Sequence, residues 1–258
     1  MTSSRSRPKN PLLRYLRAEA GPTPFCPGCG CGTVLNLIAH AIDELGLDPR
    51  ELVAVTGIGC SSWIPSPYLR CDTLHTTHGR ALAFATGIKI YNPDLRILVV
   101  AGDGDLLAIG GNHLIHAARR NLPMAVLLVN NSIYAMTGGQ VAPTTPKGTK
   151  TTTTPYGNPE APMDAARLAA AAGARFVARW TTYHVFPLKN AIKTALTTDG
   201  TAFVEIVSQC PVAYGKVSGL RSPAEQIRRF RDRSVRVSSL EEARARADAI
   251  TVGTLVGP

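Results

Sequence analysis

Short hydrophobic runs recur along the chain, and in each run the residues of both parities are apolar. The runs cover Leu52–Thr56, Ile97–Ala101, Ala125–Asn130 and Ala202–Val207. A strand buried on both faces of a parallel sheet has this pattern, because neither of its faces meets water. The pattern therefore predicts four strands in the interior of a parallel sheet.

Segments with helical periodicity separate these strands. They cover Thr33–Leu45, Gly79–Ile90, Asn112–Arg120, Asp164–Ala172 and Phe186–Leu196. Strands that alternate with helices are typical of an α/β fold, in which helices flank a mostly parallel sheet. In such folds the ligand site forms in the loops that leave the carboxyl ends of the strands. We therefore expect the functional residues in those loops.

Composition divides the 258 residues into three sections. Residues 22–216 contain all of the predicted strands and helices, and an apolar fraction of 45% is sufficient for a full core. The flanking sections are rich in arginine. We expect a basic N-terminal segment over residues 1–21, partly extended, and a basic C-terminal extension over residues 217–258. The extension has closely spaced arginines at Arg228, Arg229, Arg231, Arg233 and Arg236.

The chain is basic, with 28 Lys and Arg against 18 Asp and Glu and a net charge of +10. Such charge is suited to a polyanion such as nucleic acid. However, the signatures of common nucleic-acid modules are missing, and the C-terminal arginines alternate with acids, as in a solvated helix or a subunit contact. The chain also lacks both a membrane-spanning apolar run and the apolar core of a secretory signal. We expect a soluble, cytoplasmic protein that binds neither nucleic acid nor membrane.

Polar groups follow the second and third predicted strands. Gly102, Asp103, Gly104 and Asp105 come after one strand, and Asn131 follows the next. Asp103 and Asn131 offer the hard oxygen ligands that Mg²⁺ prefers. The glycines allow backbone N–H groups to approach a phosphate closely. Since Mg²⁺ commonly completes its coordination with water and phosphate oxygens, a diphosphate is the natural ligand.

Twenty-five residues separate this Gly-Asp-Gly sequence from Asn130-Asn131, which is enough for one crossover helix and the next strand. With this spacing the sequence resembles the thiamine diphosphate enzymes, whose motif runs from Gly-Asp-Gly to Asn-Asn. The resemblance implies that Mg²⁺ is held on the diphosphate by Asp103, by the side chain of Asn131 and by the backbone carbonyl of Ile133.

Six cysteines are too few for a disulfide scaffold in a chain of this length. Cys26 and Cys29 form a Cys-x-x-Cys turn, while Cys60 and Cys210 lie in loops that leave predicted strands. The turn alone would suit a thiol–disulfide couple. Four thiolates brought together from separate loops suit a zinc ion or a [4Fe–4S] cluster, and their spacing does not distinguish the two.

Several motifs occur in order along residues 22–216. They are Cys26-Pro27-Gly28-Cys29-Gly30, Gly57-Ile58-Gly59-Cys60-Ser61, His78-Gly79-Arg80-Ala81, Thr137-Gly138-Gly139-Gln140 and Cys210-Pro211. Together with the thiamine motif, this set resembles the β subunits of the 2-oxoacid:ferredoxin oxidoreductases. The resemblance implies a thiamine diphosphate-binding fold and one [4Fe–4S] cluster on Cys26, Cys29, Cys60 and Cys210. It implies cofactor contacts at Gly59, Cys60, Ser61, His78, Gly102, Asp103, Gly104, Asp105, Asn131, Ile133, Thr137 and Gly138.

Two cysteines are left over. Cys31 is a less favoured replacement for Cys29, because Cys-x-x-Cys fits a cubane better than Cys-x-Cys, and Cys71 is interpreted as a small buried hydrophobic residue. His75 is interpreted as structural. The polar segment with Thr144, Thr145, Lys147, Lys150 and Thr151–Thr154 is either an exposed loop or a loop at the active site or a subunit interface.

The implied activity is oxidative decarboxylation of a 2-oxoacid with coenzyme A, which gives acyl-CoA, CO₂ and reduced ferredoxin. The thiazolium of thiamine supplies an electron sink, and cysteine-ligated clusters reach potentials below about −400 mV. No Glu stands in a context that resembles the acid beside the pyrimidine ring. The resemblance therefore implies an α subunit, or α and γ subunits, in a heterodimer or heterotetramer, and an isolated chain without activity.

The substrate is less sharply indicated. Motifs at Gly110–His113, His116–Asn121 and Trp180–His184 are most similar to the members that act on 2-oxoglutarate. However, Trp63 stands where those members commonly have a basic residue suited to the second carboxylate, so pyruvate or a branched-chain 2-oxoacid is an alternative. A non-catalytic subunit that is stabilised by zinc or binds nucleic acid is the alternative from another class.

Overall fold

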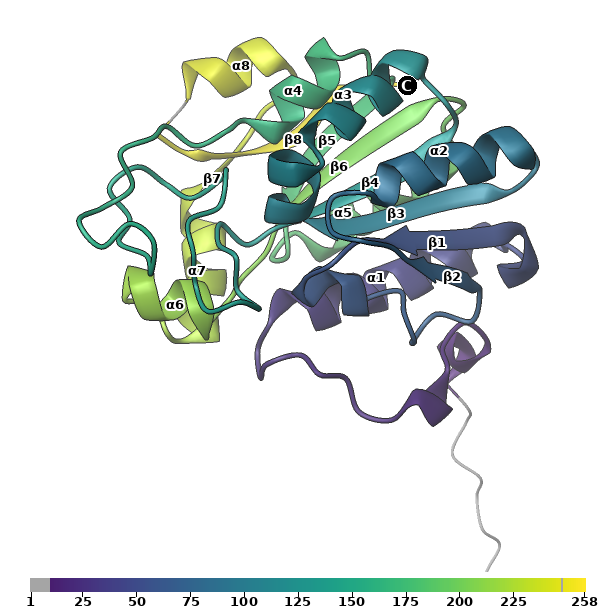
Figure 1. Cartoon of the computed structure of the whole chain (residues 1–258), viewed down its shortest axis with the longest axis horizontal. Helices are drawn as coiled ribbons and strands as arrows, with labels where there is room; N and C mark the ends of the chain where they lie inside the picture. The colour runs from purple at the N-terminus through teal and green to yellow at the C-terminus, as the bar shows by residue number, and fades with distance from the viewer. Residues whose placement is uncertain (1–9, 247) are drawn as a thin grey trace, which may run out of the picture.

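The computed structural model describes residues 10–246 and 248–258. Within this part of the chain, eight strands form one central sheet in the order β2-β1-β3-β4-β6-β5-β8-β7 (Figure 1). The strands are β1 Leu52–Thr56, β2 Asp72–His75, β3 Arg96–Gly102, β4 Met124–Asn130, β5 Phe176–Thr181, β6 Thr201–Val207, β7 Ser234–Arg236 and β8 Ile250–Val256.

The sheet is parallel from β2 to β5, while β8 is antiparallel to β5. The predicted α/β fold with a mostly parallel sheet is thus confirmed. The four predicted strands are the adjacent strands β1, β3, β4 and β6. All seven residues of β4 are buried, which explains why both parities of this run are apolar.

Helices cover both faces of the sheet (Figure 1). On one face lie α1, Gly30–Leu45, and α5, Val185–Thr197. On the other lie α2, Ala81–Tyr91, α3, Gly111–Arg120, and α4, Ala165–Ala171. These five helices confirm the five predicted segments to within three residues at each end.

The sequence pattern did not predict four of the strands. β2 is short and lies at the sheet edge, while Arg179 interrupts the apolar run of β5. The last two strands belong to the C-terminal extension, so this section of the chain continues the central sheet. It also contributes α7, Pro223–Arg233, and α8, Leu240–Ala245, whereas α6, Ala213–Ser218, spans its boundary with the preceding section.

The N-terminal segment, which was expected to be partly extended, contains two short 3-10 turns at Pro11–Arg14 and Ala18–Ala20. Residues 1–9 of this predicted segment lie outside the described residues. Leu12 and Tyr15 are buried, so the described part of the segment, residues 10–21, packs against the domain. Among the described residues, no helix combines the length and the apolar character that a membrane span needs.

Candidate active site

A cavity of about 180 Å³ lies at the carboxyl ends of β1, β3 and β4. Eleven of the twelve predicted cofactor contacts line it, because parallel strands deliver their C-terminal loops to one edge of the sheet. Gly138, the twelfth, is not part of the lining. The eleven residues are Gly59, Cys60, Ser61, His78, Gly102, Asp103, Gly104, Asp105, Asn131, Ile133 and Thr137.

Sequence reasoning missed four residues of this lining: Ile58, Tyr134, Ala135 and Met136. Tyr134 has a clear role in the shape of the site. Its hydroxyl donates a hydrogen bond to the carbonyl oxygen of Gly104 at 3.0 Å, and its ring lies so close that a Cβ at Gly104 would stand 2.2 Å from Cε1. Glycine at this position therefore permits the ring to pack directly on the backbone.

Asp103 is the carboxylate among the predicted Mg²⁺ ligands, and it is buried, since only 3% of it is exposed. The Thr144 hydroxyl donates a hydrogen bond to its Oδ2. Burial raises the pKa of Asp103 to about 6. A cation in the cavity would favour the ionised carboxylate, so this group suits a metal-binding position. Because Thr144 and Thr145 are buried, this part of the threonine-rich segment belongs to the site and is not an exposed loop.

Asn131 also lines the cavity, and its side-chain oxygen accepts a hydrogen bond from the backbone N–H of Ile133 at 3.2 Å. This contact holds the two predicted ligands in one tight turn. A buried carboxylate, an amide oxygen and a backbone carbonyl form a hard oxygen donor set of the kind that Mg²⁺ takes. The residues therefore fit the predicted ion.

His78 stands at the cavity wall, where Asp105 orients it. Its Nδ1 lies 2.7 Å from Oδ1 of Asp105, and the same oxygen accepts a hydrogen bond from the backbone N–H of Gly79 at 2.5 Å. Burial is the main cause that raises the pKa of Asp105. Gly79 has φ +75°, a left-handed conformation that favours glycine, and this turn brings its N–H to the carboxylate.

A second cavity, of about 260 Å³, is lined by all four predicted cluster cysteines: Cys26, Cys29, Cys60 and Cys210. Among residues 10–246 and 248–258, no three His, Cys, Asp or Glu side chains converge closely enough to hold one metal ion. A cluster does not require such convergence, because each of its four irons takes its own thiolate. The arrangement of thiols around one cavity therefore fits a cluster.

The other two thiols lie outside the lining of this cavity, and both are buried. Cys31 is in the first turn of α1, where its polar groups beside Cys29 lower the pKa of Cys29 to about 7. Burial raises the pKa of Cys71 to about 11. The interpretation of Cys71 as a small buried residue agrees with its position.

Helix α7 contacts both the loop of Cys210 and the Cys-x-x-Cys turn, and sequence reasoning missed these contacts. The side-chain oxygen of Gln226 accepts a hydrogen bond from the backbone N–H of Cys210 at 3.0 Å. Pro223 packs on Gly28 of the Cys-x-x-Cys turn, where a Cβ would stand 2.3 Å from the proline Cγ. Neither contact has a local sequence signal, because each joins segments that are distant along the chain.

The two cavities are neighbours with a shared wall. Cys60, Asn131, Ala135 and Met136 line both of them. A group in the first cavity and a group in the second would therefore be separated by little more than these side chains.

The chain is similar to several characterised proteins. Residues 57–206 match the thiamine pyrophosphate enzyme family, C-terminal TPP binding domain. The chain is 52% identical over 233 residues to 2-oxoglutarate synthase subunit KorB of Methanocaldococcus jannaschii, which covers 90% of this chain and 86% of that protein. It is 46% identical over 187 residues to 2-oxoacid:ferredoxin oxidoreductase 2, subunit beta, of Aeropyrum pernix, with 72% of this chain and 60% of that protein covered.

Among solved structures, the chain is similar to 2-oxoglutarate:ferredoxin oxidoreductase from Magnetococcus marinus, determined with 2-oxoglutarate, coenzyme A and succinyl-CoA bound. The TM-score is 0.86 at 35% sequence identity, and the match covers 96% of this chain and 84% of that one.

Proposed function

Because the chain belongs to the β subunits of the 2-oxoacid:ferredoxin oxidoreductases, within the thiamine pyrophosphate enzymes, we propose that it serves the oxidative decarboxylation of 2-oxoglutarate. The reaction would consume coenzyme A and give succinyl-CoA, CO₂ and reduced ferredoxin. One observation carries the proposal: the cavity with the thiamine motif and the cavity with the four cysteines share a wall. This arrangement suits decarboxylation that is coupled to electron removal.

Thiamine diphosphate would supply the electron sink for decarboxylation, Mg²⁺ would neutralise its diphosphate, and a [4Fe–4S] cluster would accept electrons one at a time. Asp103, Asn131 and the carbonyl of Ile133 would hold the metal ion. The cluster ligands would be Cys26, Cys29, Cys60 and Cys210. The remaining predicted contacts, Gly59, Ser61, His78, Gly102, Gly104, Asp105, Thr137 and Gly138, would bind the cofactor.

His78 and Asp105 would act together at the cavity wall. The 2.7 Å contact with Asp105 places the Nδ1 edge of the imidazole against the carboxylate, which leaves its other nitrogen on the opposite edge. An imidazole in this position can hold a proton or donate a hydrogen bond without losing rotamer freedom at each turnover. His78→Asn should therefore lower activity while leaving the sheet intact.

Trp63 favours a second candidate substrate. It lines the cysteine cavity, and 40% of its surface is exposed. Its ring lies edge-on to the His75 ring, with 6.2 Å between the ring centroids. An indole cannot pair with a second carboxylate. A smaller or more apolar 2-oxoacid, such as pyruvate or a branched-chain acid, would suit this position. Turnover of the complex with 2-oxoglutarate, pyruvate and 2-oxoisovalerate distinguishes these substrates, and a clear preference for either of the last two would overturn the first assignment.

The activity is expected to require an α subunit, or α and γ subunits, that carry the acid for the pyrimidine ring. The chain and its partner, co-purified without oxygen, should contain four irons and four sulfides per β chain and show broad visible absorption. A colourless protein with stoichiometric zinc would overturn the cluster. Substantial turnover by the isolated chain with thiamine diphosphate, coenzyme A and 2-oxoacid would overturn the need for a partner.

A further inference from the structure

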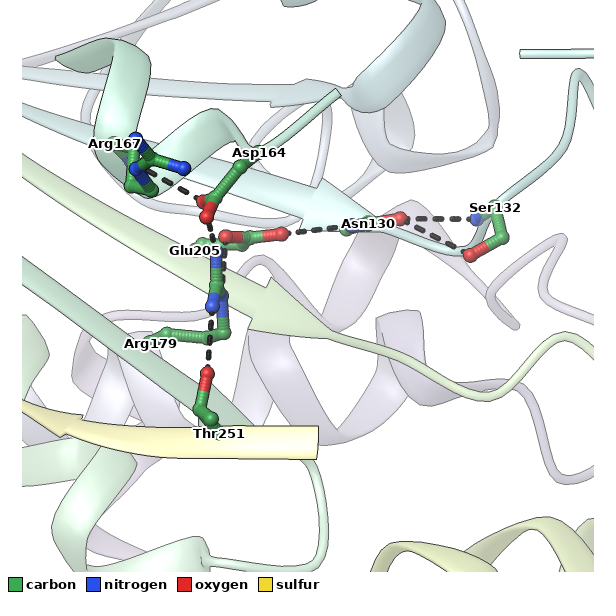
Figure 2. Close-up of polar contacts among 7 residues, drawn as sticks. All are labelled: Asn130, Ser132, Asp164, Arg167, Arg179, Glu205 and Thr251. Carbon is green, nitrogen blue, oxygen red and sulfur yellow. Dashed lines mark hydrogen bonds and ion pairs between the residues drawn. The ribbon is translucent and has the colours of Figure 1, made fainter. Parts of the chain in front are cut away.

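A buried polar network links the C-terminal strand β8 to the turn that carries the predicted Mg²⁺ ligands (Figure 2). Arg179 Nη1 donates to Thr251 Oγ1 at 2.9 Å, and Arg179 Nε donates to Glu205 Oε2 at 2.7 Å. The other oxygen of Glu205 accepts a hydrogen bond from Asn130 Nδ2 at 2.8 Å. Arg179 also pairs with Asp164, so its guanidinium is held from three sides.

The network lies where apolar residues would serve the fold. Glu205 is 3% exposed, and the side chain of Arg179 is 13% exposed. These residues face each other on the adjacent strands β5 and β6, within a sheet whose neighbouring positions are hydrophobic. An ion pair in such a place costs desolvation that its attraction often fails to offset, so stability alone does not account for it.

The far end of the network fixes a strained turn. Asn130 Oδ1 accepts hydrogen bonds from the backbone N–H of Ser132 at 3.1 Å and from its hydroxyl at 3.4 Å. Ser132 has φ +62°, a left-handed conformation that residues with a side chain seldom adopt. Such a conformation persists only where its surroundings determine it strongly. Asn130 provides that restraint, because its side-chain amide cannot rotate by half a turn without losing the hydrogen bond to Glu205.

This turn sets the direction of both neighbouring groups that line the cofactor cavity. Asn131 precedes Ser132, and Ile133 follows it. A change in the backbone at Ser132 would therefore move the Asn131 side chain and rotate the peptide that carries the Ile133 carbonyl.

We propose that Glu205 and Arg179 are positioning residues for the metal and diphosphate site, which they control through Asn130. The proposal rests on the proposed function, because Asn131 and Ile133 serve as Mg²⁺ ligands only if the chain binds thiamine diphosphate. Partners that orient metal ligands in this way commonly change metal affinity by roughly 10- to 100-fold when they are removed.

The test uses the complex with its partner subunit and the substitution Glu205→Met, which keeps the side-chain length and removes the acceptor oxygens. Thr201→Val is the matched control. Thr201 is fully buried on the same strand, and its hydroxyl donates to carbonyl oxygens of Ala117 and Leu122 at 3.2 and 2.9 Å, at the end of β6 away from the site. Both substitutions remove buried hydrogen bonds, but only the first removes the restraint on Asn130.

Two measurements are made on each protein. Electron paramagnetic resonance gives the apparent Kd for Mn²⁺ with thiamine diphosphate present, and hydrogen exchange of the cofactor-free complex reports on the peptide that contains residues 130–134. Glu205→Met is expected to raise the Kd roughly tenfold or more and to speed exchange, whereas Thr201→Val should leave the Kd within about twofold of wild type. Unchanged exchange together with an unchanged Kd in Glu205→Met would overturn the proposal.

Where Glu205→Met does not yield a folded complex, Glu205→Gln replaces it. Gln keeps one acceptor oxygen for Asn130 but loses the charge that holds Arg179. The Kd for Mn²⁺ and the exchange rate of residues 130–134 should therefore both rise, but by less than in Glu205→Met. An equal Kd for Mn²⁺ and equal exchange rates in Glu205→Gln and Thr201→Val would also overturn the proposal. Failure of the wild type to bind Mn²⁺ with thiamine diphosphate would instead refute the proposed function, while the exchange measurement would still decide the role of Glu205.

Discussion

Gly28→Ala tests whether the packing of α7 on the Cys-x-x-Cys turn is needed for the cysteine site. Gly28 has φ +76°, and its Cβ position lies 2.3 Å from Cγ and 2.5 Å from Cβ of Pro223. Two costs therefore add. A left-handed conformation costs a residue with a side chain about 1–2 kcal/mol, and overpacking against a rigid ring costs about 1–3 kcal/mol.

The substitution should therefore destabilise the turn by about 2–5 kcal/mol, a large part of the roughly 5–15 kcal/mol that stabilises an ordinary domain. Since the sheet lies elsewhere, the strain should open the turn and α7 before the domain unfolds. The complex is purified without oxygen, and iron and acid-labile sulfide are measured per β chain. Gly28→Ala should lower both, with little change in far-ultraviolet circular dichroism.

A second substitution separates the two costs. Pro223→Gly removes both atoms that would clash and leaves the conformation of residue 28 unchanged, so Gly28→Ala/Pro223→Gly should recover part of the iron content. The coupling free energy, from urea unfolding of the four proteins, should be about 1–3 kcal/mol. Wild-type iron content in Gly28→Ala would refute the packing argument. A harmful Gly28→Ala without any recovery would show that the backbone conformation alone is responsible.

Three further predictions follow from the site. Gly104→Ala places a Cβ 2.2 Å from the Tyr134 ring, so it should weaken thiamine diphosphate binding by at least roughly tenfold in a fluorescence titration, and wild-type affinity would contradict the packing. Cys29→Ala should abolish the cluster, whereas Cys31→Ala should retain its iron; the reverse result would exchange the two roles. Burial lowers the pKa of His184, so the unfolded chain takes up a proton first as the pH falls below about 7, and the wild type should lose stability on acidification. Urea unfolding at several pH values should show a smaller loss for His184→Gln, and parallel curves would contradict this.

Local sequence patterns predicted the centre of the sheet well because burial on both faces leaves a strong signal. β4 is apolar at nearly every position, and its bounds were predicted to within one residue. β5 was not predicted because Arg179 stands in its middle, where a charged residue normally indicates an exposed position. The exception arises because Glu205 and Asp164 supply the missing counter-charges, and they come from other parts of the sequence.

The same reasoning explains what could be predicted of the site. Residues that follow buried parallel strands meet at one edge, so Gly102–Asp105 and Asn131 could be placed together from the strand order. His78 follows none of the predicted strands, and only the family resemblance pointed to it. Tyr134 was not selected, because its role depends on a close approach to Gly104 across two loops. Pro223 and Gln226 lie in an arginine-rich segment whose composition indicates a solvated helix, and nothing local points to the cysteine loops.

The ends of the sheet strands explain why the two cavities are separate and yet adjacent. Cys29 and Cys60 pack against the core on the α1 and α5 face, whereas Leu106, in the π-helical segment Gly104–Ile109, belongs to the core on the α2 and α3 face. The strand ends therefore lie between the two sites, and Cys60 and Asn131 form the boundary. These two residues follow the buried strands β1 and β4, which anchor the boundary in the sheet. It follows that substitutions that loosen α7 should reduce iron content without weakening thiamine diphosphate binding. Substitutions that loosen the turn after Asn130 should weaken thiamine diphosphate binding without reducing iron content.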